Sequence, residues 1–157
     1  MTEIDLQPLF PDPILDQTAL DPGYDGHGSD VLRVTTTETA VARSFRLAGV
    51  DEPFFGGLYH LFGIDPSRTH HIEPLNAQLN GLSTIRVPQV LRKAILNGRE
   101  WVVVEYLPGH TLEEFAGDDL MYDFGVQLAR IHSRHFFDYG SPTNVRWSLD
   151  TFHIRVI

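Results

Sequence analysis

The chain has 157 residues, of which 42% are hydrophobic and 21% are charged, so its composition is that of a globular protein rather than a disordered or fibrous one. It contains no cysteine, which excludes a disulfide scaffold, cysteine-bound zinc and a thiol nucleophile. The formal net charge of −9 disfavours binding to nucleic acid or to an anionic membrane, because the phosphate groups would repel the chain.

The N-terminal segment, residues 1–20, contains three prolines and scattered apolar residues. It has neither the basic start nor the apolar stretch of a signal peptide, and no apolar run in the chain reaches the roughly 18 residues of a membrane span. We therefore expect a cytoplasmic protein without a membrane partner, whose leader packs on a surface or forms a short helix.

A β-hairpin is predicted after a glycine-rich turn at residues 21–29. The segment 31–34 is apolar, and 39–46 alternates between apolar and polar residues, as in a half-buried strand. The polar residues 35–38 form the tip between the two strands.

Two helices are predicted next. Residues 51–63 place apolar side chains at helical spacing, although the pair Gly56-Gly57 weakens this helix. In the second helix Pro74 is expected at the first helical position, followed by leucines at helical spacing up to Leu82.

The clearest hairpin in the chain joins residues 90–96 to 101–106 through Asn97-Gly98. Asparagine followed by glycine supplies the positive φ angles that a tight hairpin turn requires. The second strand begins with the apolar run WVVV, which predicts a central strand covered on both faces.

The C-terminal third is predicted to be helical. Residues 111–114 fit a capping box, and 118–134 carry an apolar stripe typical of an amphipathic helix. Residues 136–147 are expected to form a loop, and 148–157 to begin a further helix. Hairpins that precede and separate helices favour an antiparallel α+β fold over a parallel, doubly wound one.

Two segments carry a family resemblance: VVVEYLPGHTL at 102–112 and QLARIH at 127–132. They resemble the aminoglycoside phosphotransferase and choline kinase family, a branch of the protein-kinase-like fold, over about residues 22–157. The resemblance implies a leader at 1–20, a kinase-like N-lobe with a mostly antiparallel sheet at 21–107, and, at 108–157, the hinge and first helices of a truncated C-lobe.

The same resemblance implies a nucleotide site. The glycine-rich turn would hold phosphate through the backbone of Gly26, Gly28 and Ser29, because no Cβ blocks the approach. The carbonyl of Glu105 and the N–H of Leu107 would bind adenine at the hinge. The alternatives stay open: the glycines can simply make a turn, and Glu105 can be an ordinary edge residue.

The phosphate-binding lysine of the family has no direct counterpart. Arg43 occupies the matching position, and the only lysine, Lys93, lies on another strand. Arginine is a planar fork rather than a point charge, so either Arg43 contacts the phosphates or nucleotide binding is weakened. Its expected partner is Glu73, which could also merely cap a helix.

The catalytic loop of the family, His-Gly-Asp with an Asn five residues after the Asp, is missing from the sequence, as is the later magnesium-binding Asp. Asp138 and Asn144 are six residues apart and follow the QLARIH helix too closely. His132 and His135 could share one helix face, but no carboxylate accompanies them at a familiar spacing. We therefore assign no catalytic and no metal-binding residue; Mg²⁺ and a hydroxyl acceptor belong to the intact family member.

Two functions remain in view. The first is the nucleotide-binding lobe of an ATP-dependent small-molecule phosphotransferase, inactive as this chain and with weak or absent ATP binding. The alternative is a non-catalytic kinase-like module for binding or dimerisation. In either case the apolar stripes of 118–157 predict a homodimer through that region.

Overall fold

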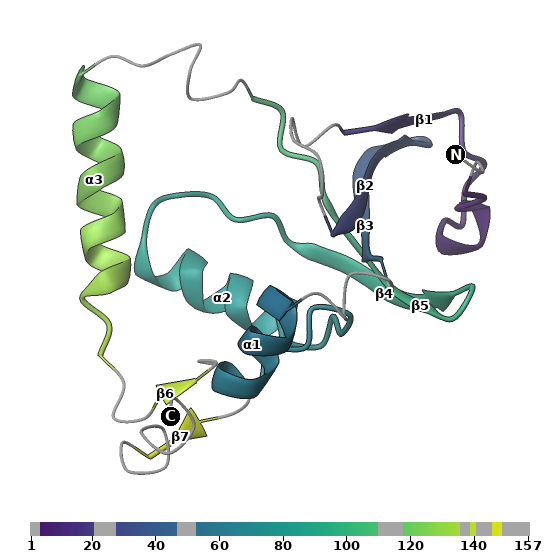
Figure 1. The fold of residues 1–157 in the computed structure, drawn as a ribbon. Coiled ribbons are helices and arrows are strands. Elements are labelled where there is room, and N and C mark those ends of the chain that lie inside the picture. The colour runs from purple at the N-terminus through teal and green to yellow at the C-terminus, as the bar shows by residue number, and fades with distance from the viewer. Residues whose placement is uncertain are drawn as a thin grey trace.

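The computed structural model describes residues 4–20, 28–46, 53–109, 118–135, 139–140 and 146–148. Within these residues the chain is an α+β fold, with a five-stranded antiparallel sheet, three α-helices and a separate two-stranded ribbon (Figure 1). The predicted fold class is confirmed. No helix in the described part is long and apolar enough to cross a bilayer.

The five-stranded sheet has the order β1-β2-β3-β5-β4, and neighbouring strands are antiparallel throughout. The strands are β1 (Asp16–Ala19), β2 (Ser29–Thr35), β3 (Thr39–Phe45), β4 (Val90–Leu96) and β5 (Arg99–Glu105). Both predicted hairpins are confirmed. The edge strand β1 lies within the expected leader and is an addition to the predicted elements.

One face of the sheet carries the hydrophobic core. Its central members are buried alternate residues of β2, β3 and β5, namely Val34, Ala40, Ala42, Trp101 and Val103. The short 3₁₀ helix η1 (Gln7–Leu9) closes this face, since Leu6 and Leu9 are also buried in the cluster. The N-terminal segment is therefore part of the domain core, which explains why it holds apolar residues between its prolines.

The strand β5 is covered on both faces, as its apolar run predicts. Trp101, Val102 and Val103 are only 1–2% exposed, and β5 lies between β3 and β4. The turn before it has φ angles of 53° at Asn97 and 75° at Gly98, the left-handed region that this pair of residues tolerates.

The helices α1 (Pro53–Phe62) and α2 (Ile72–Leu82) follow β3 in the chain and lie beside the sheet (Figure 1). Both were predicted, but α2 begins two residues before Pro74, so the predicted start is wrong. Proline is tolerated there because the N–H groups of the first turn have no partner within the helix.

The long helix α3 (Asp118–His132) confirms the best predicted helix and stands apart from the sheet in Figure 1. The Thr84 N–H donates to Gln127 Oε1 at 3.0 Å and thereby ties the end of α2 to α3. Part of the expected loop forms a ribbon of β6 (Tyr139–Gly140) and β7 (Arg146–Trp147). The capping box at 111–114 and nearly all of the helix expected at 148–157 lie outside the described residues.

Candidate functional site

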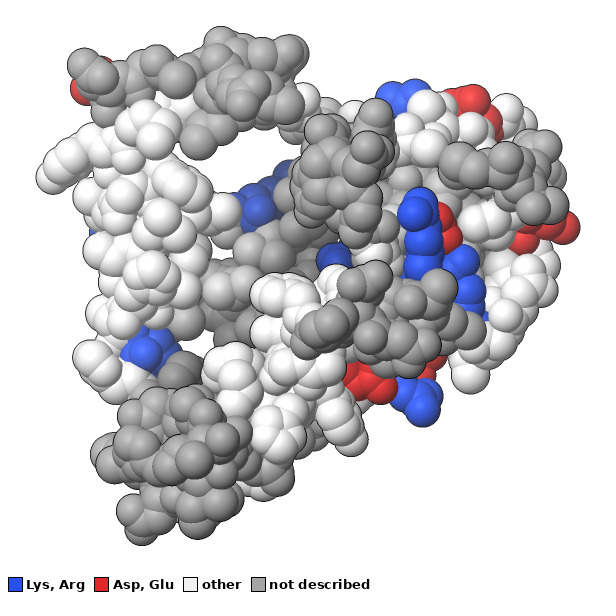
Figure 2. Space-filling view, viewed as in Figure 1, with Lys and Arg blue, Asp and Glu red and all other residues white. Residues whose placement is uncertain are grey.

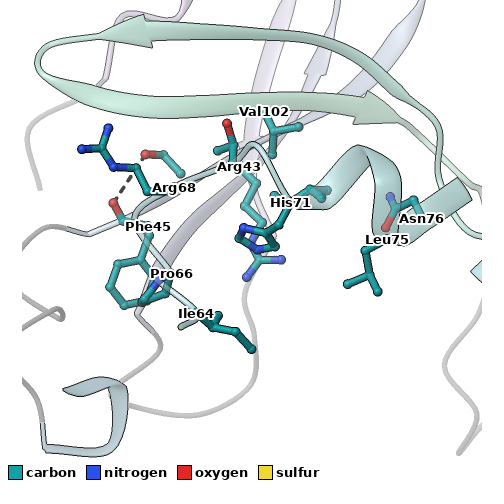
Figure 3. Close-up of a pocket in the computed structure, with 12 residues that line it drawn as sticks. Arg43, Phe45, Ile64, Pro66, Arg68, His71, Leu75, Asn76 and Val102 are labelled. Atoms are coloured by element: carbon teal, nitrogen blue, oxygen red, sulfur yellow. Dashed lines mark hydrogen bonds between the residues drawn. The ribbon is translucent and has the colours of Figure 1, made fainter. Parts of the chain in front are cut away.

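A pocket of about 280 Å³ lies on the face of the sheet opposite the hydrophobic core. β3 and β5 form one wall, while residues 64–72, which link α1 to α2, and α2 itself form the other (Figure 3). The labelled side chains of Arg43 and His71 point into the same space. The lining residues are Arg43, Ser44, Phe45, Ile64, Pro66, Arg68, Thr69, His71, Ile72, Leu75, Asn76 and Val102.

The strand register places Arg43 and Lys93 in one row across this face. Arg43 is paired with Val102 on β5, and Val102 is paired with Lys93 on β4. Paired residues in a sheet project to the same side, so two basic residues from distant parts of the sequence flank one buried valine. This row is a product of the strand order and is not visible in the sequence.

The expected pairing of Glu73 with Arg43 is not what the structure shows. Glu73 lies in the first turn of α2, and its Oε2 is 2.7 Å from the Nζ of Lys93. This ion pair joins the first turn of α2 to β4. Arg43 has no ion pair or hydrogen bond to its side chain among the residues that the structure describes.

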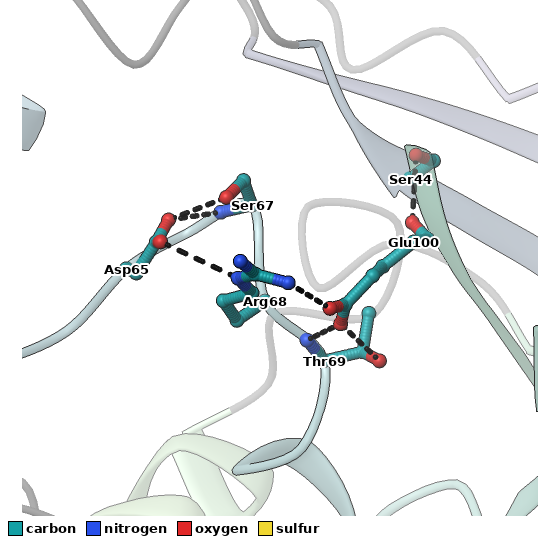
Figure 4. A network of polar contacts seen from close by, with 6 residues as sticks. All are labelled: Ser44, Asp65, Ser67, Arg68, Thr69 and Glu100. Atoms are coloured by element: carbon teal, nitrogen blue, oxygen red, sulfur yellow. Dashed lines mark hydrogen bonds and ion pairs between the residues drawn. The ribbon is translucent and has the colours of Figure 1, made fainter. Parts of the chain in front are cut away.

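A polar network fixes the link between α1 and α2 to the edge of the pocket (Figure 4). Asp65 accepts hydrogen bonds from the backbone N–H and the hydroxyl of Ser67, at 2.9 and 2.6 Å. Glu100 on β5 accepts from Arg68 Nη1 at 2.8 Å and from the Thr69 N–H at 2.7 Å. The network holds the backbone of this wall against the sheet.

The charge of Glu100 is stabilised by this network. Burial raises the pKa of the Glu100 carboxyl, but hydrogen bonds from Arg68 and Thr69 outweigh that effect and hold the pKa below its ordinary value of 4.5. Glu100 is therefore ionised at neutral pH. Its charge is paired with that of Arg68.

The end of β3 is held by a second charged cluster. Asp30 on β2 lies 2.8 Å from Arg46 and 2.7 Å from Arg99, and its side chain is 13% exposed. Burial raises the pKa of Asp30, but hydrogen bonds from the two arginines outweigh it and hold the pKa below 3.8. Arg99 also donates to the backbone carbonyls of Ser44 and Phe45.

Of the predicted phosphate-binding glycines, only Gly28 lies within the described residues, and Gly26 lies outside them. Gly28 precedes β2, and a Cβ at its position would come within 2.6 Å of the Phe45 ring. A side chain at residue 28 would therefore require the Phe45 ring to move. Ser29 is buried at the start of β2.

The predicted hinge follows β5 without secondary structure. The Glu105 side chain pairs with Arg86, and its backbone N–H donates to the Gln89 carbonyl at 2.9 Å. The half-buried Leu107 has a backbone N–H with no hydrogen-bond partner among the described residues. Glu105 is therefore tied to the segment 86–89 through both its side chain and its backbone.

The half-buried His71 was not predicted as a site residue. The sequence places His70 and His71 in a polar loop, whereas the structure turns the second ring into the pocket (Figure 3). Burial lowers the pKa of His71 below 6.5, and the charges of His70 and Arg43 lower it further, against the opposite effects of Asp65 and Glu100. The one local signal for this wall of the pocket is the pair Ile72 and Leu75. These apolar residues are three positions apart, so they share a face of α2, and both line the pocket.

Comparison with protein families matches residues 43–152 to the fructosamine kinase family. The chain belongs to the fructosamine kinase family. No curated protein sequence matches the chain. The resemblance to protein-kinase-like phosphotransferases is confirmed by this membership, while the narrower assignment to aminoglycoside phosphotransferases or choline kinases is not confirmed.

The fructosamine kinase match begins at Arg43 and includes the pocket wall from α2, the predicted hinge and α3. The glycine-rich turn precedes the matched range. A kinase-like family uses ATP and Mg²⁺ in general. Within the described residues no group of three or more His, Asp or Glu side chains could hold a metal ion. A magnesium site is therefore not identified among these residues.

Proposed function

We propose that this member of the fructosamine kinase family carries the nucleotide-binding lobe of an ATP-dependent small-molecule phosphotransferase. The observation that carries the proposal is Arg43, which projects from β3 into a pocket and has no ionic partner among the described residues. The pocket supplies a cation where the kinase-like resemblance places the phosphate chain.

The phosphate end of the proposed site is formed by Arg43 and the start of β2. A guanidinium carries donors in a fixed fork that matches phosphate oxygens, so arginine can replace lysine with changed geometry. Gly28 supports the close packing of this backbone on Phe45. Gly26 and Ser29 stay predicted contacts of the glycine-rich turn.

The adenine end of the proposed site is the segment after β5. Adenine presents one donor and one acceptor on a flat edge, and an extended backbone can meet both. The expected donor is the N–H of Leu107, which has no hydrogen-bond partner among the described residues, and the expected acceptor is the carbonyl of Glu105. Arg86 and Gln89 hold Glu105 in place, so the acceptor is pre-positioned.

Glu73 enters this proposal in a changed role. Its carboxylate pairs with Lys93 on β4, so it anchors the first turn of α2 to the sheet and does not orient Arg43. The wall of the pocket that α2 provides is thereby positioned. Arg43 is left to interact with an anionic ligand.

Phosphoryl transfer itself requires a base and metal-binding side chains, and the sequence lacks the family's pattern for both. We therefore expect this chain to bind nucleotide weakly and to transfer no phosphate. The hydroxyl acceptor of an active relative would be selected outside this lobe; the family name makes a fructosamine the first acceptor to test.

Isothermal titration of the full chain with ADP and with adenosine tests the phosphate end. We expect dissociation constants near 1 mM, about 4 kcal/mol of binding free energy, with ADP binding more tightly than adenosine. Arg43→Ala should remove the advantage of ADP and leave adenosine binding unchanged. Arg130→Ala, an exposed arginine of α3 outside the pocket, is the matched control. Equal loss of both ligands in Arg43→Ala would show that Arg43 is structural.

The adenine end is tested by Leu107→Pro, which removes the backbone N–H, against Leu107→Ala, which keeps it. Adenosine binding should be lost in the proline variant and kept in the alanine variant. Circular dichroism of both variants checks that the fold is intact. If the two variants bind adenosine equally, the hinge does not contact adenine.

The second candidate function, a self-associating kinase-like module, rests on α3. Leu120, Met121, Tyr122 and Phe124 are each at least 37% exposed on this helix. A second copy of the chain could cover them across a two-fold axis. Light scattering should then give a dimer at micromolar concentration and a monomer for Phe124→Asp; a wild-type monomer would exclude this candidate.

A further inference from the structure

The pocket has the opposite charge character to the chain as a whole. The sequence holds 21 acidic and 12 Lys or Arg residues, yet the described residues that line the pocket include Arg43, Arg68 and His71 and no carboxylate. In the space-filling view, basic side chains also lie set back in the hollow between α3 and the sheet (Figure 2). A cavity whose described charged lining is basic favours an anionic occupant.

The carboxylates nearest the pocket are already engaged. Asp65 is bound by Ser67, and Glu100 is bound by Arg68 and Thr69. Glu73, the acid of the adjoining helix turn, is bound by Lys93. None of these three carboxylates is therefore left to pair with the two remaining basic residues of the pocket.

Those two residues are Arg43, which is permanently charged, and His71, which is charged only when it is protonated. Figure 3 draws the imidazole beside the guanidinium, and the charge of Arg43 acts on the His71 ring. Neither side chain makes a hydrogen bond to another described residue; the His71 ring has only an edge contact with the His70 ring, with centroids 5.6 Å apart. Both groups line the cavity, and their hydrogen-bonding atoms have no partner among the described residues.

We propose that His71 is a second phosphate-contacting residue of this pocket and works together with Arg43 to bind the phosphate chain of a nucleotide. The inference rests on the proposed nucleotide-binding function and adds a residue to it. The guanidinium supplies a permanent charge, whereas the imidazole supplies one only when it is protonated. Phosphate binding should therefore be coupled to the uptake of a proton by His71.

The sign of this coupling follows from the groups that face His71. In the free protein burial, His70 and Arg43 disfavour the imidazolium, and Asp65 and Glu100, both paired with Arg68, compensate only in part. A bound dianion would reverse the balance and raise the pKa of His71. By linkage, the dianion must then bind more tightly at pH 6 than at pH 8.

Proton NMR of the histidine ring resonances of the full chain measures this directly. With saturating ADP we expect the pKa of His71 to rise by about one unit, which corresponds to about tenfold tighter binding to the protonated form. Sodium sulfate is a second probe, because its charge is constant over this pH range; sodium chloride at equal ionic strength is the control. His71→Gln assigns the resonance, and His70→Gln is the matched neighbouring variant.

Each outcome of this titration supports or overturns the role of His71. An upward shift with ADP and sulfate, lost in Arg43→Ala, supports the joint site. If ADP binds more tightly than adenosine but the pKa of His71 does not change, His71 does not contact the phosphates. The proposed nucleotide-binding function then still holds. Binding of ADP no tighter than adenosine overturns both. A shift of His70 equal to that of His71 would reveal a general ionic effect and also overturn the inference.

Discussion

The two faces of the five-stranded sheet use the same strands for opposite purposes. On one face Val34, Ala42, Trp101 and Val103 form a dry core under the N-terminal segment. On the other face the neighbouring residues of the same strands include Arg43, Lys93 and Glu100, which line or support a polar pocket. Alternation along each strand allows a stable core and a charged site to be one residue apart.

The two faces therefore contribute differently: the core face provides stability, and the pocket face provides the candidate binding site. The core face gains stability from apolar burial that needs no specific partner. The pocket face depends on a few directed contacts. Its charged side chains lower the stability of the fold unless they stay hydrated or pair with an anion. Substitutions on the two faces should consequently differ in size and in their response to pH and salt.

The largest expected effect is on the core face. Leu9→Ala should lower the free energy of unfolding by about 2–5 kcal/mol, because Leu9 is 3% exposed and its removal leaves a cavity. Ile95→Ala, on the pocket side of β4 and 74% exposed, should change it by less than about 0.5 kcal/mol. Urea denaturation of both variants measures the difference; equal losses would contradict the assignment of the core to one face.

An intermediate effect is expected at Glu100. Glu100→Gln weakens the contacts with Arg68 and Thr69 and should cost about 1–3 kcal/mol at pH 7. Because the folded pKa of Glu100 lies below 4.5, its contribution is present above that pH and is lost as the pH falls through the folded pKa. The difference in the free energy of unfolding between the wild type and Glu100→Gln, measured by urea denaturation, should therefore decrease below pH 4.5.

The matched control for this experiment is Glu38→Gln, whose side chain is exposed in the turn between β2 and β3. It should change stability little at either pH. A Glu100→Gln penalty that persists undiminished at low pH would mean that the loss comes from packing and not from the charge of the carboxylate.

The smallest expected effect belongs to the pair of Lys93 and Glu73, whose side chains are 36% and 58% exposed. A double-mutant cycle of Lys93→Met and Glu73→Gln should give a coupling of about 0.2–1 kcal/mol, decreasing at high salt. A larger, salt-independent coupling would show that the pair holds α2 more firmly than its exposure indicates.

Local chemistry explains which elements the sequence could predict. Asn97-Gly98 specified its hairpin through φ preferences, and the apolar run of β5 indicated a strand covered on both sides. The edge strand β1, DQTA, was missed because it is short and polar and forms only by pairing with β2. Its existence depends on a strand partner and not on its own side chains.

The residues of the candidate site also fall into those that the sequence could predict and those that depend on tertiary contacts. Arg43 could be identified by its place in a strand and by the family resemblance, and Leu107 by its position after the apolar strand. His71 and the Glu100 network could not, because their importance comes from contacts between β5 and a link some thirty residues earlier in the chain, as the hydrogen bonds of Glu100 show. No local pattern encodes such a contact.

The sequence by itself determined the α+β class, both hairpins, the existence of the three described helices and the basic residue of β3, since each follows from turn chemistry, periodicity or position within one segment. The tertiary structure alone decided which acid meets which base. Strand order placed Arg43 and Lys93 on either side of Val102, and the position of α2 beside the sheet brought Glu73 to Lys93. Ion pairs depend on distances of a few ångströms between remote segments, and only the folded chain sets those distances.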